Sequence, residues 1–309
     1  MPRGVFQRAV QRFARADPEL WRRTHSWVIA VDGRSRTRYD ATRCKEWALV
    51  DLTGKCAIVC GSTQGIGRAC AEILARQGAA VTLVARDESA LRTTVSKLPS
   101  AAGQEHRFIC ADFRDPALVG EKVVHHVERF GPVEVLINNT GGPPAGPIFG
   151  ADVVGLTKAF AMHVLCNQLL AQALVPGMKE RGYGRIINII SISVKQPIPG
   201  LGVSNTIRGA VAGWSKTLAG ELGPFGITVN NVLPGYTDTG RLRSLIALKA
   251  ERAGVSTDGM TQSMVAEIPL RRFANPEEIA AAVAFLASPD AAYINGVNLP
   301  VDGGRTSSL

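Results

Sequence analysis

The chain has 309 residues, of which 46% are hydrophobic and 20% charged, and its formal net charge is +9. This composition allows a full buried core and excludes fibrous and disordered proteins. Charged and turn residues interrupt the apolar runs well before the roughly 20 residues that a bilayer-spanning helix needs, so we expect no membrane segment.

The first 49 residues hold much of the excess positive charge. Eleven Lys and Arg residues face five acids there, a charge of +6, which leaves +3 for the rest of the chain. We expect an irregular, basic extension over residues 1–49. As a helix it would place Phe6, Val10 and Phe13 opposite several arginines, the pattern of a mitochondrial transit peptide. A surface arm, or a stretch upstream of a natural start near Leu49, are the alternatives.

The main body gives no sign of a nucleic-acid or metal partner. Its charge is mild, and it contains no zinc-finger or recognition-helix pattern. The six cysteines form no CxxC pair and have no histidine at ligand spacing. We expect reduced thiols and a cytoplasmic protein, or a mitochondrial-matrix protein if the extension is a transit peptide.

From Lys55 onward, short apolar runs alternate with amphipathic stretches, which predicts repeated βαβ units. Right-handed crossovers then give an α/β fold, a Rossmann-type doubly wound parallel sheet of about seven strands flanked by helices, as a single domain over residues 50–309. The predicted strands are 55–60, 80–85, 106–111, 133–138, 184–190, 226–232 and 297–300. The predicted helices are 66–77, 87–97, 115–130, 157–181, 203–223 and 275–288.

A glycine-rich turn follows the first of these strands. Gly61 allows a sharp exit from the strand, Gly65 allows backbone to approach phosphates, and Gly67 allows the next helix to pack closely on the sheet. The first amides of that helix would face a pyrophosphate. Because the turn opens a long βαβ series, it predicts a dinucleotide site.

With its GxxxGxG spacing, the turn resembles that of the short-chain dehydrogenase/reductase family. The stretches 138–141 (Asn-Asn-Thr-Gly) and 230–235 (Asn-Asn-Val-Leu-Pro-Gly) are similar to further family blocks, as are segments near Pro269, Pro276, Phe285 and Val301. The resemblance covers about residues 51–304 and extends to members of the 3-oxoacyl-acyl-carrier-protein reductase type. It implies hydride transfer between a nicotinamide and a carbonyl or secondary alcohol of a small-molecule substrate.

The end of the second strand indicates which nucleotide is preferred. An acid there would bind the adenosine ribose and favour NAD, but the position holds Ala85. Arg86 follows and could pair with a 2′-phosphate, which favours NADP, with NAD possible. By resemblance Asp112 contacts the adenine; a structural cap is its alternative. The predicted cofactor contacts are Gly61, Ser62, Gly65, Ile66, Gly67, Arg86, Asp112, Asn138, Pro234, Gly235 and Thr237.

The catalytic positions depart from the family pattern, which uses Ser, Tyr, Lys and Asn. Ser191 aligns with the family serine, but Ser204 stands where the Tyr should be and Arg208 where the Lys should be. His163 falls at the Asn position. No tyrosine lies between residues 183 and 236, so a shifted alignment does not restore one. The segment 204–208 resembles an SNxxR variant of divergent members, and we expect a different working site.

Neither Ser204 nor Arg208 is acidic enough to replace a tyrosine as proton donor. His163 could supply the proton through a water, because a free imidazole titrates near ~6.5. Lys195 is another candidate; both residues also have simple structural explanations. Arg208 could anchor the cofactor ribose or an acidic substrate group.

A stretch between Gly235 and Pro269 resembles the family's substrate lid, and it contains several basic residues, Arg241, Arg243, Lys249 and Arg252. An anionic substrate would suit such a lid, although solvated charges explain it equally well. The sequence therefore predicts an NADP-preferring oxidoreductase, or alternatively a cofactor-binding protein with little turnover. The resemblance also implies a homo-oligomer, a tetramer or a dimer.

Overall fold

The computed structural model describes residues 26–31, 35–40 and 50–308. Two compact units divide the chain, Met1–Leu49 and Val50–Leu309, and each is described by itself. In the first unit, β1 (Ser26–Val31) pairs antiparallel with β2 (Ser35–Asp40), with Ser26 opposite Asp40. The expectation of an irregular segment is therefore wrong for these residues. Alternating β-branched and aromatic residues on either side of an Asp-Gly dipeptide are a hairpin signal. The proposed helix with Phe6, Val10 and Phe13 lies outside the described residues.

The second unit is built on a parallel seven-stranded sheet of order β5-β4-β3-β6-β7-β8-β9. This order confirms the predicted doubly wound fold. All seven strands are parallel, but the chain adds β4 and β5 on one side of β3 and then β6 to β9 on the other side. Ligands of such sheets bind at the switch point between β3 and β6, where the order of strands reverses. The strands are β3 (Cys56–Cys60), β4 (Ala80–Ala85), β5 (Arg107–Cys110), β6 (Val135–Asn138), β7 (Gly184–Ile189), β8 (Ile227–Pro234) and β9 (Asn298–Val301).

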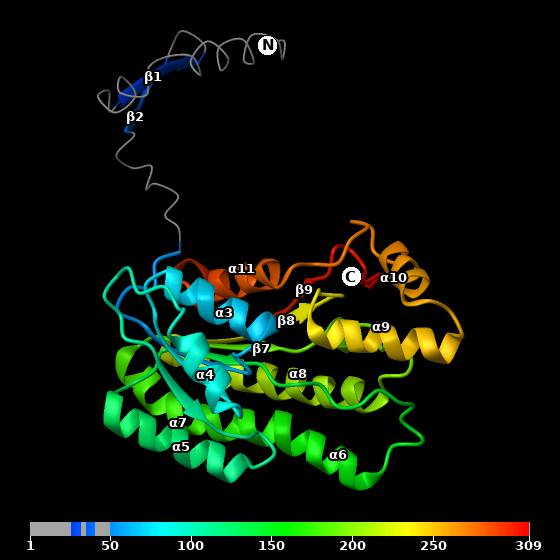
Figure 1. The fold of residues 1–309 in the computed structure, drawn as a ribbon. Coiled ribbons are helices and arrows are strands. Elements are labelled where there is room, and N and C mark those ends of the chain that lie inside the picture. The colour runs from blue at the N-terminus through cyan, green and yellow to red at the C-terminus, as the bar shows by residue number, and fades with distance from the viewer. Residues whose placement is uncertain (1–25, 32–34, 41–49, 309) are drawn as a thin grey trace. The chain divides into compact units, whose positions relative to one another are not determined.

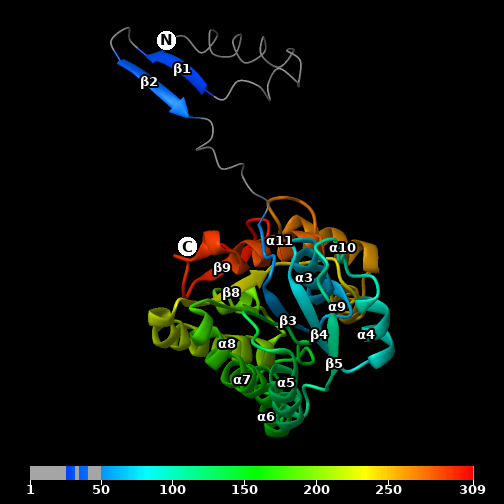
Figure 2. The ribbon, with the colours of Figure 1, turned by 90° about the vertical axis from the view of Figure 1, so that its left-hand side faces the viewer.

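Helices cover both faces of the sheet (Figures 1 and 2). One apolar cluster joins the sheet to α3 (Gly65–Arg76), α4 (Glu88–Val95) and α11 (Pro276–Ala287). A second cluster joins its other face to α5 (Pro116–Phe130), α7 (Cys166–Arg181) and α8 (Gly202–Leu222). Both faces are thus buried, which explains why the strands read as nearly continuous apolar runs.

A single long helical segment corresponds to the predicted helix 157–181. It consists of α6 (Val153–Phe160), a π-helical turn (Ala161–Leu165) and α7. Val153–Arg181 has 29 residues and contains an 18-residue window of mean hydropathy 1.3, of which 33% is buried; it meets the length and composition of a membrane span, contrary to our reading of the apolar runs. One such helix is weak evidence, and Leu170, Leu174 and Met178 of α7 lie in the core beside the sheet. A buried core helix of this composition passes the same test.

Asparagines connect four neighbouring strands in one row. Asn138 of β6 donates to Asn188 of β7 (2.8 Å), Asn188 donates to Asn231 of β8 (2.9 Å), and Asn231 donates to Asn298 of β9 (2.8 Å). Each residue stands directly opposite the next in the strand register. Asn188 also donates to Ser215 of α8, at 3.3 Å. We name this row the asparagine ladder; it pairs side-chain amides across the sheet, while Asn138 Oδ1 at its β6 end is buried without a hydrogen-bond partner among the described residues.

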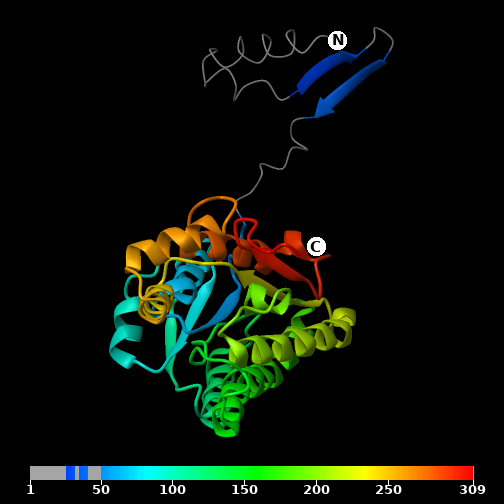
Figure 3. The same cartoon turned by 90° about the vertical axis from the view of Figure 1, so that its right-hand side faces the viewer.

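Two helices between Gly235 and Pro269 were not predicted. They are α9 (Gly240–Ala253) and α10 (Thr257–Ala266), which follow β8 and are yellow and orange in Figure 1. Figure 3 shows them on the opposite side of the unit from the last strand, β9, in red. Thr239 begins α9 by accepting the Leu242 N–H at 3.3 Å, and Leu242, Ile246 and Met264 pack around Tyr236. Few apolar positions on an exposed helix pair give a weak periodic signal.

Candidate active site

The glycine turn after β3 is sterically closed to any side chain. Gly61 has φ +60°, and a Cβ there would lie 2.5 Å from the Asn139 carbonyl oxygen. At Gly67 a Cβ would lie only 2.2 Å from the Gly61 carbonyl oxygen and 2.6 Å from Asn139 Nδ2. Gly65 has φ +54° and faces Thr239. The turn therefore packs directly against the chain that follows β6, as the glycine pattern predicts.

The start of α3 has the properties of an anion site. Gln64 precedes the helix without a side-chain cap, and no acidic residue stands in the first turn. The first amides of the helix are thus open to a ligand, and the helix dipole favours a negative one. Together with the glycines, these open amides fit the pyrophosphate of a dinucleotide. A hollow of about 370 Å³ lies beside them, lined by Gln64, Gly65, Arg68, Asp238, Thr239 and neighbouring residues.

Asn139 and Ser62 hold the turn in shape. Asn139 Nδ2 donates to the carbonyl oxygens of Cys60 (3.2 Å) and Gly61 (3.3 Å). Ser62 is fully buried, and its hydroxyl donates to Val84 O at 3.4 Å. The Ser62 side chain therefore supports the turn from inside, which differs from the predicted direct contact with the cofactor. Ile66 is half-buried and packs on the α3 side of the core.

Arg86 is exposed just beyond β4, and among the described residues it forms no ion pair. Its guanidinium is therefore available to a phosphate. Asp112, after β5, already uses both carboxylate oxygens in hydrogen bonds. It accepts from the Arg114 backbone N–H (2.9 Å) and from the Arg114 guanidinium (2.6 Å). These contacts lower the pKa of the Asp112 carboxyl. Because both oxygens have partners within the loop, the alternative that Asp112 is a structural cap has direct support.

The other predicted cofactor contacts lie at the carboxyl edges of β6 and β8. Asn138 is 4% exposed and its side-chain nitrogen belongs to the asparagine ladder, and its contact with the cofactor stays a prediction. Its neighbour Asn139 faces the turn instead. Gly235 donates to Val301 O (3.0 Å), and a Cβ there would lie 2.7 Å from Asp302. Thr237 is buried and donates to Gly235 O at 3.2 Å, while Pro234 ends β8.

Ser191 and Ser204 belong to neighbouring segments after β7. Ser191 is half-exposed, and its Oγ accepts the Ser193 backbone N–H at 3.1 Å, which leaves the hydroxyl proton available. Lys195 ends the short turn that Ser191 begins. Ser204 is half-buried in the first turn of α8. Its neighbour Asn205 donates to Ile198 O (3.0 Å) and so fixes the intervening loop.

His163 lies in the π-helical turn, 2% exposed, with its Nδ1 2.6 Å from the Thr140 hydroxyl. Burial, followed by the nearby charge of Arg208, lowers the pKa of His163 to about 3. The imidazole is therefore neutral at pH 7. The expectation that it titrates near its free value is wrong, because the solvent that stabilises an imidazolium is excluded.

Arg208 lies at the centre of the crevice, 8% exposed. Its guanidinium donates to Ile189 O at the end of β7 (2.9 Å) and to Thr140 O after β6 (3.4 Å). Burial and the charge of Arg241 lower the pKa of Arg208 to about 10, so it stays charged at neutral pH. Arg241, in the first turn of α9, donates to Pro143 O at 2.7 Å. Both arginines thus hold the loop after β6.

The three tyrosines within residues 50–308 have their hydroxyls elsewhere. The Tyr183 hydroxyl donates to Ala287 O (2.6 Å), at the far end of the sheet. Tyr236 packs under α9 and α10, and its hydroxyl accepts from Arg305 at 2.9 Å. Tyr293 lies fully exposed before β9. The structure thus agrees with the sequence that the tyrosine acid of the resembled family is missing.

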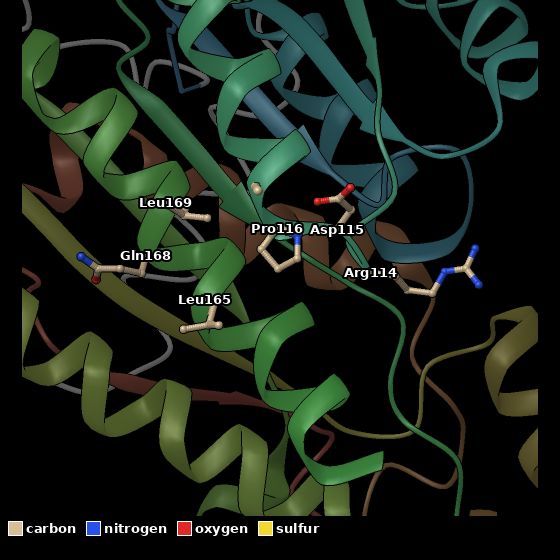
Figure 4. Close-up of a pocket in the computed structure, with 7 residues that line it drawn as sticks. Arg114, Asp115, Pro116, Leu165, Gln168 and Leu169 are labelled. Carbon is tan, nitrogen blue, oxygen red and sulfur yellow. The ribbon is translucent and has the colours of Figure 1, made fainter. Parts of the chain in front are cut away.

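Another hollow lies elsewhere. It measures about 650 Å³ and lies where α5 begins beside α7, lined mainly by Pro116, Leu165 and Leu169 (Figure 4). Its lining includes Arg114 but neither the glycine turn nor Arg208 or Arg241. An open, apolar hollow between helices has little of the polar chemistry that a catalytic site needs. We therefore place the site at the carboxyl edge of the sheet.

Sequence reasoning missed four residues of this crevice: Asn139, Thr140, Thr239 and Arg241. Asn139 and Thr140 stand within the quoted block 138–141, and Arg241 among the lid cations. The signal was therefore present, but only tertiary contacts showed which side chain of each block faces the crevice.

The second unit is similar to several known proteins. A family model described as enoyl-(acyl carrier protein) reductase matches residues 61–306. The short-chain reductase protein NovJ of Streptomyces niveus is 36% identical over 258 residues, which are 81% of this chain and 93% of that protein. The 3-oxoacyl-[acyl-carrier-protein] reductase FabG of Vibrio cholerae is 31% identical over 82% of this chain and 98% of its own.

Solved structures give the same result. The L-sorbose reductase of Gluconobacter frateurii, in complex with NADPH and L-sorbose, superimposes with a TM-score of 0.79 and 34% identity. The match covers 84% of this chain and 99% of that one. The fold is thus shared along almost the whole second unit.

Proposed function

We infer, because the chain belongs to the short-chain dehydrogenase/reductase family, that it is an NADP-dependent oxidoreductase acting on a carbonyl or secondary alcohol. The observation that carries this conclusion is the closed glycine turn with the open amides of α3, which fits a pyrophosphate. When bound, NADPH supplies the hydride. Gly61–Gly67 would hold its pyrophosphate, and the exposed Arg86 its 2′-phosphate.

The chain's own residues divide the remaining work. Ser191 keeps its hydroxyl proton and donates it as a hydrogen bond to the substrate oxygen. Arg208 stays charged and largely shielded from water at the ends of β6 and β7, where it binds a negatively charged group of the substrate. His163 stays neutral and, with Thr140, orients the loop after β6. No acid of suitable pKa stands among these residues, so the final proton comes from water.

This set of catalytic residues is atypical, and the missing phenol favours a second candidate: a cofactor-binding protein with little turnover. The two candidates differ in one measurement. NADPH oxidation is followed with a panel of ketones, 3-oxoacyl esters and oxo acids, for the wild type and for Ser191→Ala and His163→Ala. We expect turnover that falls at least about tenfold in Ser191→Ala. If the wild type binds NADPH but exceeds Ser191→Ala on no substrate, the second candidate is correct.

The substrate class, assembly and location are finer proposals. The match to FabG supports a 3-oxoacyl type of substrate. Exposed apolar side chains on α5 and before α7, Val124, Phe130 and Leu165, support a homotetramer or dimer through these helices. The described cysteines are free thiols, which supports a reducing compartment, the cytoplasm or the mitochondrial matrix.

A further inference from the structure

Two arginines meet in the crevice without an acidic partner, and we propose that Arg208 and Arg241 bind a carboxylate of the substrate. The compound reduced would then be an oxo acid. This inference rests on the proposed function for the position of the reacting carbonyl, whereas the binding of the carboxylate by the two arginines does not depend on it.

The first step is the charge of Arg208. It is 8% exposed, yet the described residues contain no carboxylate within ion-pair distance of it. A guanidinium has five N–H donors, and the contacts to Ile189 O and Thr140 O use two of them. Buried charges are normally paired, because removal from water is costly without an opposite charge. The remaining donors therefore fit an anion that arrives with a ligand.

The second step is the approach of Arg241. A Cβ on Gly142 would lie 3.7 Å from a terminal nitrogen of Arg241 and 4.0 Å from one of Arg208. Both guanidiniums thus border the same small volume beside Gly142. Arg241 has no acidic partner among the described side chains and uses one terminal nitrogen for Pro143 O. Burial lowers the pKa of Arg208 and the nearby charge of Arg241 lowers it further, and an anion between the two guanidiniums would relieve their repulsion.

The third step concerns which anion enters. The phosphates of a dinucleotide have their own seat, at the glycine turn after β3 and at Arg86 after β4. Arg208 instead contacts the ends of β6 and β7, on the other side of the switch point. Ser191 follows by two residues Ile189, whose carbonyl accepts from Arg208, so Ser191 and Arg208 are both positioned at the carboxyl end of β7. The planar fork of arginine matches a carboxylate in a bidentate manner. A substrate with its carbonyl at Ser191 and its carboxylate at the arginines satisfies both sites.

The test compares acids with their neutral esters. Calorimetry on protein saturated with NADP⁺ measures the binding of pyruvate, acetoacetate and levulinate and of their methyl esters. We expect at least one acid to bind about tenfold or more tightly than its ester, because charge-assisted hydrogen bonds are lost in the ester. Arg241→Gln should remove most of this preference, and Arg241→Lys should restore only part of it.

Arg243→Gln is the matched control. Arg243 is an exposed cation in the same turn of α9, but it pairs with Asp238 at 3.1 Å. It should change the acid preference less than about twofold. Arg241 is exposed, so its replacement leaves the core intact, whereas Arg208 variants test folding as well as binding.

Three results would overturn the proposal. In the first, the esters bind as tightly as all three acids. In the second, Arg241→Gln and Arg243→Gln lose the preference for acids equally. In the third, the acids compete with NADP⁺ and therefore occupy a phosphate site. A failure of the proposed function gives a different result: the protein binds no NADP⁺ at all. The acid-ester comparison is then made on the nucleotide-free protein, where it confirms or refutes the arginine site by itself.

Discussion

Gly67 allows α3 to sit directly on the glycine turn, and its replacement by alanine tests this packing. The new Cβ would lie 2.2 Å from the Gly61 carbonyl oxygen, 2.8 Å from its carbon and 2.6 Å from Asn139 Nδ2. Two of these atoms are backbone, so no flexible side chain can move aside. The start of α3 must shift away from the turn, or Asn139 must give up its hydrogen bonds to Cys60 and Gly61.

Opposing contributions set the magnitude. Alanine favours a helix by about 1 kcal/mol over glycine. Overpacking a close contact costs about 1–3 kcal/mol, and loss of the Asn139 bonds costs about 1 kcal/mol more. The steric cost exceeds the helix preference, so we expect Gly67→Ala to lower the free energy of unfolding by about 1–3 kcal/mol. Because the displaced amides no longer converge on the phosphates, NADPH affinity should fall at least about tenfold.

Urea unfolding and NADPH fluorescence titration measure both effects, with Gly213→Ala as the control. Gly213 lies on the exposed side of α8, where a Cβ would meet nothing within 4 Å. There the helix preference acts alone, and the free energy of unfolding should rise by about 0.5–1 kcal/mol with unchanged NADPH affinity. If Gly67→Ala behaves like Gly213→Ala in both assays, the close packing of the turn is not what forms the nucleotide seat.

Three further predictions concern a charge, a titration and the asparagine ladder. Arg86→Ala should weaken NADPH binding at least about tenfold and leave NADH binding unchanged, as calorimetry would show; equal losses would contradict the 2′-phosphate assignment. His163 has a folded pKa of about 3, below its unfolded value near 6.5. The unfolded chain therefore binds the proton more readily, and the free energy of unfolding falls as the pH drops from about 6.5 towards 3. The wild type should therefore lose more unfolding free energy than His163→Asn between about pH 7 and about pH 4.5, and parallel pH curves would refute this. Asn188→Ala, in the ladder's interior, should cost about 2–4 kcal/mol of unfolding free energy in urea, whereas Asn298→Ala at the exposed edge should cost less than about 1 kcal/mol; similar losses would show that the ladder does not act as a buried network.

The sequence determined the frame of the second unit. Strands β3 to β9 lie within two residues of their predicted bounds, because strands buried on both faces carry continuous apolar runs. The helices that cover them carry a 3.6-residue period, and right-handed crossovers order the sheet. The glycine turn could also be predicted from the sequence, because the need for residues without a side chain shows in the spacing of the glycines. The loss of the family tyrosine could also be read directly.

Other features left weak local signals. The pair α9 and α10 buries few side chains, so its apolar period is poor. The hairpin of β1 and β2 stands in a segment whose arginines suggested irregular structure. The long helix 153–181 contains a π-helical turn, which no periodic pattern announces.

Only the tertiary structure decided the chemistry of the crevice. Whether Asn138 or Asn139 faces the turn depends on how β6 twists as it leaves the sheet, and the two residues read alike in sequence. His163 loses its basicity through burial, a property of the surrounding fold. Arg208 and Arg241 stand 33 positions apart in the chain, yet both reach Gly142. Periodicity and steric demands act between near neighbours and are therefore written in the sequence, whereas solvent exclusion and the meeting of distant charges arise only once the chain has folded.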